Sequence, residues 1–282
     1  MGKFDRVLLA SDFDNTLVYT KAAIDAGSAD VPPLPARNRE ALDYFTRNGG
    51  YFSVATGRAL PAFARYAPTL PLTAPCILAN GAGIYDFRTE EYLATAFLHE
   101  GVRAHIAQLL AEFPQLPFEI YHTDRRIQAM HPNAYILGHE HLTRTKIVAV
   151  ESFDEVDFPL VKLLFEDDRD RLDALYDYIR AQSWSGAYEL IYSSDNLLEL
   201  TAKGATKGAM VLRLAERLGV KRDDLYCIGD HGNDLSMAEL SAIRFAPANA
   251  IDEMKALPEM HIVSHCADGA IADVIEALDK RY

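Results

Sequence analysis

Short apolar runs alternate with helical patterns at both ends of the chain, and this rhythm constrains the fold more than any other feature. Apolar runs at 6–11, 51–55 and 76–79 read as buried strands, and residues 35–48 and 60–66 between them have helical spacing. Strands that are joined through helices pair in parallel, with right-handed crossovers. The sequence therefore predicts an α/β fold built on a parallel sheet.

The same rhythm returns at Lys207 and continues to the end of the chain. Helices are expected at 208–218, 235–240, 250–257 and 270–278, and strands at 225–229, 243–246 and 261–263. The two terminal parts together predict one Rossmann-like, three-layer core that is made of residues 1–82 and 198–282.

The middle of the chain has a different pattern, because its strands are paired and have fewer helices between them. Its expected elements are hairpins at 118–122 with 126–130 and at 188–192 with 197–201, a strand at 160–165 and a helix at 169–182. We interpret residues 83–197 as an inserted α+β domain.

The charge balance and the apolar content exclude several classes of partner. The 282 residues include 28 Lys and Arg against 41 Asp and Glu, a formal net charge of −13. Non-specific nucleic-acid binding and docking on anionic lipid both need a basic surface. No apolar run reaches the ~20 residues of a membrane span, and no signal peptide is recognisable. We therefore predict a cytoplasmic protein without nucleic-acid or membrane partners, whose scattered cysteines are buried thiols.

Polar side chains of complementary chemistry follow the predicted strand ends and one helix start. In open α/β sheets, ligands bind beyond the carboxyl ends of the strands, so these side chains are expected to converge. They are Asp12, Asp14 and Thr16 after the first strand, Thr56, Gly57 and Arg58 after the second, Lys207 at a helix start, and Asp230, Asn233 and Asp234 after the strand at 225–229.

Converging carboxylates repel one another and need a cation to be stable. Oxygen ligands that include only a few carboxylates select Mg²⁺. A Mg²⁺ ion beside a lysine and a hydroxyl is typical of a phosphate site, where a carboxylate can attack phosphorus and form an aspartyl-phosphate. The constellation therefore predicts Mg²⁺-dependent phosphoryl transfer with Asp12 as the nucleophile.

The same residues carry a family resemblance that covers essentially the whole chain. The chain resembles the haloacid dehalogenase (HAD) superfamily of phosphohydrolases: Asp12-Phe13-Asp14-Asn15-Thr16 resembles its first motif, Thr56 its second, Lys207 its third and Gly229-Asp230 with Asn233-Asp234 its fourth. The long insertion between the second and third motifs is similar to the cap domain of the Cof-like, class IIB branch. The Asn80-Gly81-Ala82 turn also resembles that branch.

The resemblance implies a role for each motif residue. Asp12 would attack phosphorus, and Asp14 would protonate the leaving oxygen and then deprotonate the attacking water. The Asp12 carboxylate, the Asp14 backbone carbonyl and Asp230 would hold Mg²⁺, with Asp234 as a further ligand or a support for the metal waters. Thr56, the Gly57 amide and Lys207 would bind the phosphoryl group, and Asn233 would orient Lys207 or touch phosphate.

Some positions depart from the family pattern or stay open. Asn15 stands where a glycine is usual, and Asn tolerates turn conformations. Residues 21–35 read as a mobile loop that could add a wall to the site. His231 is expected to be a loop histidine, with a phosphate or leaving-group contact as the alternative. His139-Glu140-His141 is expected in a surface loop, because no third metal ligand is evident.

Possible substrate contacts are Arg58, Asn80 and, in the first hairpin of the insertion, Tyr121 and Arg125; a solvated hairpin is the alternative for the last two. We predict a phosphatase of small phosphorylated metabolites, sugar phosphates first. A hexose-phosphate phosphomutase with the same aspartyl-phosphate is the nearest alternative, and a non-catalytic metabolite-binding protein is a remote one. The sequence determines neither the substrate nor the oligomeric state.

Overall fold

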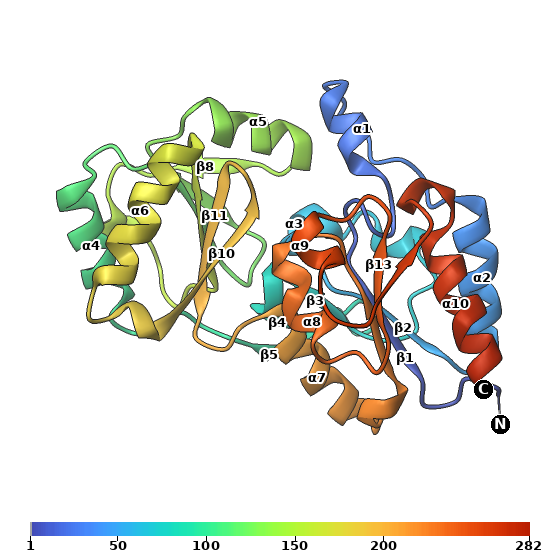
Figure 1. Ribbon diagram of the computed structural model, residues 1–282. Helices are drawn as coiled ribbons and strands as arrows, with labels where there is room; N and C mark the ends of the chain where they lie inside the picture. The colour runs from blue at the N-terminus through green and yellow to red at the C-terminus, as the bar shows by residue number, and fades with distance from the viewer. Residues whose placement is uncertain (1) are drawn as a thin grey trace.

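A five-stranded parallel sheet forms the centre of the larger part of the molecule (Figure 1). A computed structural model describes residues 2–282. The strand order is β14-β13-β12-β1-β2, and every neighbouring pair is parallel. The strands are β1 (Leu8–Ser11), β2 (Tyr51–Val54), β12 (Leu225–Ile228), β13 (Arg244–Pro247) and β14 (Met260–Val263). The predicted α/β class with a parallel sheet is confirmed.

Both faces of this sheet are covered by helices, which explains why its strands are almost continuously apolar. Leu9 points to the side of α2 (Ala36–Arg47) and α10 (Ala270–Arg281) and joins their buried side chains. Leu8 and its partner Leu225 point the other way, toward α7 (Lys207–Leu218) and α8 (Leu235–Ala238). Alternate residues of one strand therefore belong to two different cores. The shorter helices of this part are α1 (Thr20–Asp25), α3 (Leu60–Phe63) and α9 (Asp252–Lys255).

A second, six-stranded sheet lies beside the first part, with order β10-β11-β9-β6-β7-β8 (Figure 1). We call it the cap sheet. Its strands are β6 (Phe118–Tyr121), β7 (Ile127–Met130), β8 (Ile147–Ala149), β9 (Lys162–Glu166), β10 (Tyr188–Ser194) and β11 (Leu197–Ala202). Both predicted hairpins, β6–β7 and β10–β11, are present and antiparallel.

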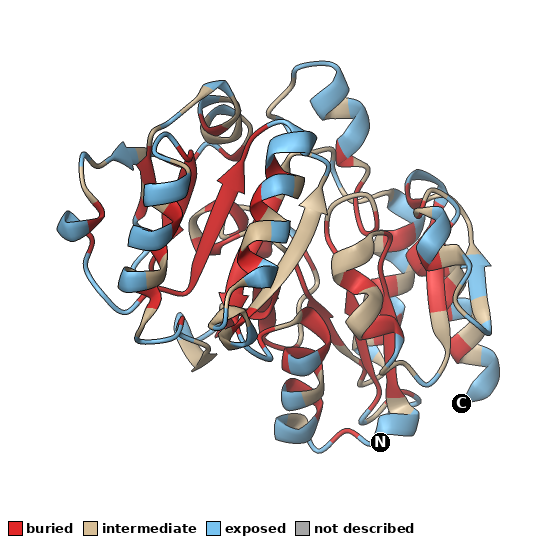
Figure 2. Cartoon of the chain, turned by 60° about the vertical axis from the view of Figure 1, so that its left-hand side comes forward, coloured by how far each residue is buried: buried red, intermediate tan, exposed pale blue. Residues whose placement is uncertain are grey.

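The two faces of the cap sheet differ in chemistry. One face packs on α4 (Val102–Glu112) and α6 (Arg169–Ala181) through residues such as Phe118, Leu163 and Leu198. The other face looks toward the parallel-sheet part and carries the alternate residues of the same strands. Figure 2 shows that the strands of both sheets are mostly buried, so polar side chains on this second face lie inside the molecule.

Three local expectations were wrong. The strand at 76–79 is β3 (Cys76–Leu78), which belongs to a separate antiparallel sheet with β4 (Gly83–Asp86) and β5 (Glu91–Thr95) and meets the parallel sheet by one bridge, Ala55 to Ile77. Residues 21–35 are not all loop, because α1 covers their beginning. His139 and its neighbours lie in a helix, α5 (Ala134–Thr143), that Asn133 caps by accepting from the Ile136 amide.

The boundaries between core and cap stay a proposal. We propose the division into residues 1–82 with 198–282 and residues 83–197. Strand pairing groups the elements differently from these boundaries. β4 and β5 lie in one sheet with β3, and β11, which begins at Leu197, lies in the cap sheet.

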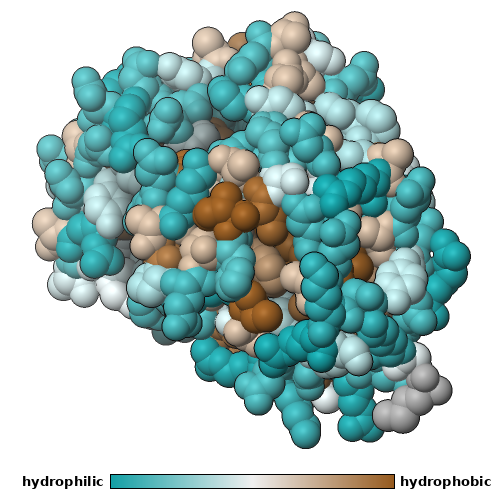
Figure 3. Space-filling model, turned by 45° about the vertical axis from the view of Figure 1, so that its right-hand side comes forward, coloured by the Kyte–Doolittle hydropathy of each residue, from teal (hydrophilic) through white to brown (hydrophobic). Residues whose placement is uncertain are grey.

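Interior and surface follow the composition. Cys76, Cys227 and Cys266 are free and buried. The face in Figure 3 is largely hydrophilic, with hydrophobic side chains gathered in a hollow near its middle. Among the described residues, none of the helices has the length and apolar character needed to span a membrane.

Candidate active site

The carboxyl ends of β1, β2 and β12 meet at one edge of the parallel sheet and bring the predicted motif residues together. Asp12 directly follows β1, and its amide donates to the carbonyl of Ile228 at the end of β12, at 2.9 Å. The side chains of Thr56 and Asp230, after β2 and β12, are buried at the same edge. Asn15, which follows Asp14, has a φ of 58°, the left-handed conformation that Asn adopts more readily than most residues.

Lys207 is the centre of this cluster. Its Nζ donates to Asp12 Oδ1 at 2.6 Å and to Asp234 Oδ1 at 2.7 Å, and its side chain is 1% exposed. Thr206 caps the start of α7 by accepting from the Ala209 amide, which fixes where Lys207 leaves the helix. Burial lowers the pKa of Lys207, but the two carboxylates outweigh burial, so the net shift is upward and the ammonium stays charged.

Both carboxylate oxygens of Asp234 accept hydrogen bonds from protein groups. Its Oδ1 accepts from Lys207, and its Oδ2 accepts from the amides of Asp230 and His231 at 3.0 and 3.1 Å. A Cβ at Gly229 would lie 2.4 Å from Asp234 Cβ and Cγ, so only glycine lets the turn close on this side chain. Asp234 therefore holds both the Lys207 ammonium and the backbone turn after β12 in place.

The carboxylates at this edge outnumber the cations, and their chemistry fits a divalent cation. Oxygens of Asp12, Asp230 and Asp234 lie within 4.8 Å of one another, all buried, around the single ammonium of Lys207. Burial, and then the charge of Asp234, raises the pKa of Asp230 to about 7. Burial also raises the pKa of Asp12 well above its usual value, although Lys207 opposes this. Asp12 and Asp230 face the adjoining cavity and are accessible to an ion; Asp234 does not line it.

Arg58 holds Asp14 through two parallel hydrogen bonds. Nε donates to Oδ2 at 2.8 Å and Nη2 donates to Oδ1 at 2.7 Å, the fork geometry that guanidinium and carboxylate groups favour. Burial raises the pKa of Asp14, but the charge and hydrogen bonds of Arg58 outweigh it, so the net pKa is lowered. The guanidinium also lies 5.3 Å from the ring centroids of Phe13 and Tyr66. Asp14 is therefore oriented by its neighbour and kept ionised.

The turn at 79–82 packs against the segment after β2 that is predicted to bind phosphate. The Asn80 side chain accepts from Asn233 Nδ2 at 3.0 Å, and its amide donates to the Thr56 carbonyl. Gly81 has a φ of 100°, and a Cβ there would lie 2.4 Å from the Thr206 carbonyl carbon and oxygen. This close approach ties the turn to the start of α7, where Lys207 begins. In the sequence, the Asn80-Gly81 pair indicates this turn.

A cavity of about 640 Å³ opens above these residues and extends to the cap sheet. Of the four possible substrate contacts, Arg58 and Tyr121 line it; Asn80 is fully buried behind its wall, and Arg125 is exposed elsewhere. His231 lines the cavity as well. The segment 21–35 supplies one wall through α1 and the residues after it, and Asp30 forms an ion pair with Arg144 at the end of α5.

Comparison with known proteins places this geometry in a family. A model of the haloacid dehalogenase-like hydrolases matches residues 9–275. The chain belongs to this family. It is 27% identical to the 5-amino-6-(5-phospho-D-ribitylamino)uracil phosphatase YwtE of Bacillus subtilis, over 97% of this chain and 99% of that protein. It is 25% identical to the HMP-PP phosphatase of Escherichia coli, over 77% of this chain and 79% of that protein.

The fold is shared with solved members of the superfamily. A sugar phosphatase of HAD subclass IIB has a TM-score of 0.79 at 22% identity, covering 97% of this chain and 99% of that chain. The predicted resemblance to the Cof-like, class IIB branch is confirmed, and the protein is a HAD-type phosphatase.

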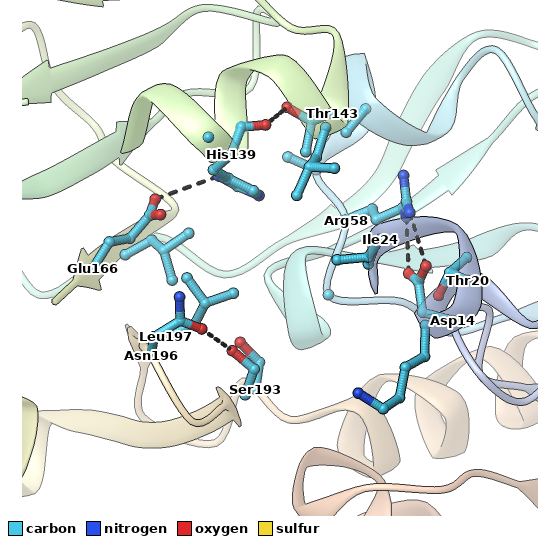
Figure 4. A pocket seen from close by; sticks show the side chains of 18 of the residues that line it. Asp14, Thr20, Ile24, Arg58, His139, Thr143, Glu166, Ser193, Asn196 and Leu197 are labelled. Carbon is cyan, nitrogen blue, oxygen red and sulfur yellow. Dashed lines mark hydrogen bonds and ion pairs between the residues drawn. The ribbon is translucent and has the colours of Figure 1, made fainter. Parts of the chain in front are cut away.

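The phosphatase also has a buried polar cluster in the cap that the sequence reading missed. His139 Nδ1 donates to Glu119 Oε1 at 2.8 Å and lies 3.3 Å from Glu166 Oε1 (Figure 4). The Tyr121 hydroxyl donates to the other oxygen of Glu119. Burial lowers the pKa of His139, but the two carboxylates raise it to about 10, so the imidazole is charged at neutral pH. His139, expected on the surface, faces the cavity instead.

A second buried ion pair lies beside this cluster and reaches across to the core. Lys162 Nζ lies 3.1 Å from Glu199 Oε2, and the two side chains are 2% and 3% exposed. The same Nζ donates to the carbonyl of Gly57 at 3.2 Å, in the loop after β2. Lys162 therefore connects the cap sheet to the segment predicted to bind phosphate.

Proposed function

We propose that the protein is a Mg²⁺-dependent phosphatase of small phosphorylated metabolites, sugar phosphates first, that acts through an aspartyl-phosphate on Asp12. The observation that carries the proposal is the position of Lys207, which joins Asp12 to Asp234 at the floor of a cavity whose wall includes Asp14. Relatives named as phosphatases of a ribitylamino-uracil phosphate and of HMP-PP, and a sugar phosphatase of the same fold, support a small phosphorylated substrate.

Asp12 is suited to attack phosphorus. Lys207 binds its Oδ1, and none of the hydrogen bonds among the described residues uses Oδ2, which leaves that oxygen for the phosphorus atom. As the Oδ2–phosphorus bond forms, the bond from phosphorus to the leaving oxygen breaks. The ammonium of Lys207 stabilises charge on Asp12 and on the phosphoryl oxygens. The Gly57 amide and the Thr56 hydroxyl lie at the same edge and supply further donors.

Asp14 is placed to move the protons. In its protonated form it donates to the leaving oxygen, and as a carboxylate it then accepts a proton from the water that opens the aspartyl-phosphate. Arg58 fixes its direction but favours the ionised form, which suits the second step. Nη1 of Arg58 has no partner among the described residues, and because Arg58 lines the cavity, this nitrogen would donate to a substrate oxygen. Proton uptake for the first step then depends on the approach of the anionic substrate to the same guanidinium.

We propose that Asp12, the Asp14 backbone carbonyl and Asp230 hold Mg²⁺, and that Asp234 supports Lys207 instead of binding the ion. Two observations support this assignment: both Asp234 oxygens are engaged by protein donors, and Asp234 does not line the cavity. The ion would neutralise the phosphate oxygens and the acidic residues that Lys207 alone leaves in excess. Asn233 Nδ2 donates one of its two hydrogens to Asn80 Oδ1, and the other would donate to the phosphoryl group.

The test is the Asp12→Asn variant, measured with sugar phosphates in Mg²⁺ and after chelation. We expect loss of essentially all Mg²⁺-dependent release of inorganic phosphate, because an amide cannot form the acyl phosphate. Asp252→Asn, on the surface, is the matched control. An Asp12→Asn protein with wild-type activity would refute the proposal, and conversion of a hexose 1-phosphate to its 6-phosphate instead of inorganic phosphate would indicate a mutase.

A further inference from the structure

Glu166 in the cap has a buried oxygen that accepts no hydrogen bond from a described protein group, although it lies 3.3 Å from the charged imidazole of His139. Its side chain is 1% exposed, and Oε1 accepts no hydrogen bond from the described residues. The nearby His139 Nδ1 carries a single proton, which it donates to Glu119. A buried carboxylate oxygen without a donor is costly, and it lies here on the wall of the cavity that also contains Asp14. Figure 4 shows Glu166 and His139 facing Asp14 and Arg58 across that space.

The unsatisfied groups of the molecule gather around this one cavity. Of the nine buried side-chain atoms without a hydrogen-bond partner among the described residues, six belong to residues that line it. On the core side they include Nη1 of Arg58, a donor suited to phosphate. On the cap side they are Glu166 Oε1, Ser193 Oγ and Glu199 Oε2, the last of which is paired with Lys162 Nζ at 3.1 Å. Glu166 Oε1 is therefore the carboxylate oxygen on this side that no cation or donor of the described residues engages as closely. Arg58 at the core end therefore favours an anion, and Glu166 at the cap end favours a hydrogen-bond donor, although the core end also presents the acceptor Asn233 Oδ1.

The charged residues on the cap side of the cavity also favour a hydrogen-bond donor over an anion. The carboxylates on this side are Glu166, Glu199 and the exposed Asp195, while Glu119 is buried against His139. The cations are His139 and Lys162, both of which are already engaged by carboxylates. A second phosphate or a carboxylate on the substrate would meet these acids at close range in a dry site, where repulsion is strong. A group that donates hydrogen bonds, and above all an ammonium, would satisfy the unpartnered Oε1 of Glu166.

We propose that the Glu166 end of the cavity binds the leaving group of the substrate, and that the preferred substrate is a phosphate monoester whose leaving group carries an amine or other hydrogen-bond donors and no second anionic group. This inference rests on the proposed phosphatase function and adds to it the chemistry of the group that is released. Glu119 acts as a positioning residue, because it holds His139 and thereby leaves Glu166 without a donor.

The experiment compares kcat/KM for glucosamine 6-phosphate, glucose 6-phosphate and 6-phosphogluconate, which offer an ammonium, a hydroxyl and a carboxylate on related six-carbon chains. We expect that order of preference in the wild type. In Glu166→Gln the ratio of glucosamine 6-phosphate to 6-phosphogluconate should fall about ten-fold, because hydrogen bonds to a charged partner are the strong ones and the amide can also donate to a carboxylate. Glu112→Gln, exposed on α4, is the matched control and should keep the wild-type ratio.

A ratio that falls less than five-fold in Glu166→Gln, or a wild type that prefers 6-phosphogluconate, would overturn the inference. The wild-type order alone decides it if the variant does not fold. Mg²⁺-dependent hydrolysis of p-nitrophenyl phosphate, which has no amine, distinguishes failure of the inference from failure of the proposed function. If the wild type hydrolyses it but none of the three sugar phosphates, the inference fails and the proposed function stands. If the wild type hydrolyses none of these esters, the proposed function itself fails.

Discussion

Arg58 determines how Asp14 is presented to a substrate, because its guanidinium binds both carboxylate oxygens. Arg58→Gln should lower kcat/KM ~10²–10³-fold, the usual effect of losing one stabilising donor. Arg58→Lys keeps the charge but not the planar fork, so it should recover only part of the activity. Steady-state kinetics on both variants, with the exposed Arg47→Gln as control, measures this. Full activity in Arg58→Lys would show that charge alone is sufficient.

Gly81 is a backbone requirement of the site. Its φ of 100° is strained for any L side chain, and a Cβ would lie 2.4 Å from the Thr206 carbonyl carbon and oxygen, next to Lys207. Gly81→Ala should therefore lower the free energy of unfolding by about 1–3 kcal/mol and reduce activity together with it. Gly186→Ala is the matched control, since nothing lies within 4 Å of the added Cβ. Urea unfolding of both variants tests the difference; equal stabilities would contradict the crowding.

The central elements of the core could be predicted because β1, β2 and β12 are buried, apolar strands that each lead into motif residues, whereas the edge strand β14 is largely exposed. The pairing of β3 could not, since Cys76–Leu78 is equally apolar in a parallel or an antiparallel sheet. Helix α5 was missed because only Ile136 and Thr143 of its ten residues are buried, so no periodic apolar face marks it. Its position over the cap sheet depends on the pairing of β6 with β9, which no local pattern encodes.

One signal of the cap cluster was nevertheless readable. Glu119, Glu166 and Glu199 each lie in a strand, directly beside buried apolar residues. Period-two alternation places such acids together on one face of a sheet. Acids on a buried face predict a polar cavity, whereas their distances to His139 required the structure.

The link between β9 and the loop after β2 can be separated from simple stability. Lys162→Met removes the contact with the Gly57 carbonyl and leaves Glu199 buried without its cation, which should cost about 3–5 kcal/mol. The double variant Lys162→Met/Glu199→Gln should regain most of that stability, because no charge is left unpaired. Its kcat/KM should stay reduced, because the cap has lost its contact with the core.

Urea unfolding and kinetics on the single and double variants distinguish the two effects. Lys203→Met, which breaks the more exposed pair with Glu189, serves as the control and should change stability little. A double variant with wild-type kcat/KM would mean that Lys162 acts only as the partner of Glu199.

At the scale of the whole molecule, the cap cluster makes stability depend on pH. The pKa of His139 is raised from 6.5 to about 10 in the folded protein, despite burial, by Glu119 and Glu166. A raised histidine pKa stabilises the fold fully below the unfolded value, and this contribution is lost as pH rises toward the folded value. Burial opposes ionisation of Glu119, but His139 outweighs burial and lowers its pKa, whereas burial raises the pKa of Glu166 to about 7, so Glu166 completes its ionisation at the start of the range from pH 7.5 to 10. Burial and Glu119 raise the pKa of the Tyr121 hydroxyl well above its usual value. His139 is then the main group of the cluster that titrates over that range.

The comparison is between the wild type and the triple variant Glu119→Gln/His139→Gln/Glu166→Gln, which keeps the shapes of the cluster but removes its imidazole and both carboxyl groups. We expect the wild type minus variant difference in unfolding free energy to fall between pH 7.5 and 10, by up to about 1.4 kcal/mol per pH unit. Other ionisable groups cancel because both proteins share them. Urea unfolding at several pH values provides the measurement, and a flat difference across this range would mean that His139 is neutral in the folded protein, so that Glu166 faces the cavity beside an uncharged imidazole.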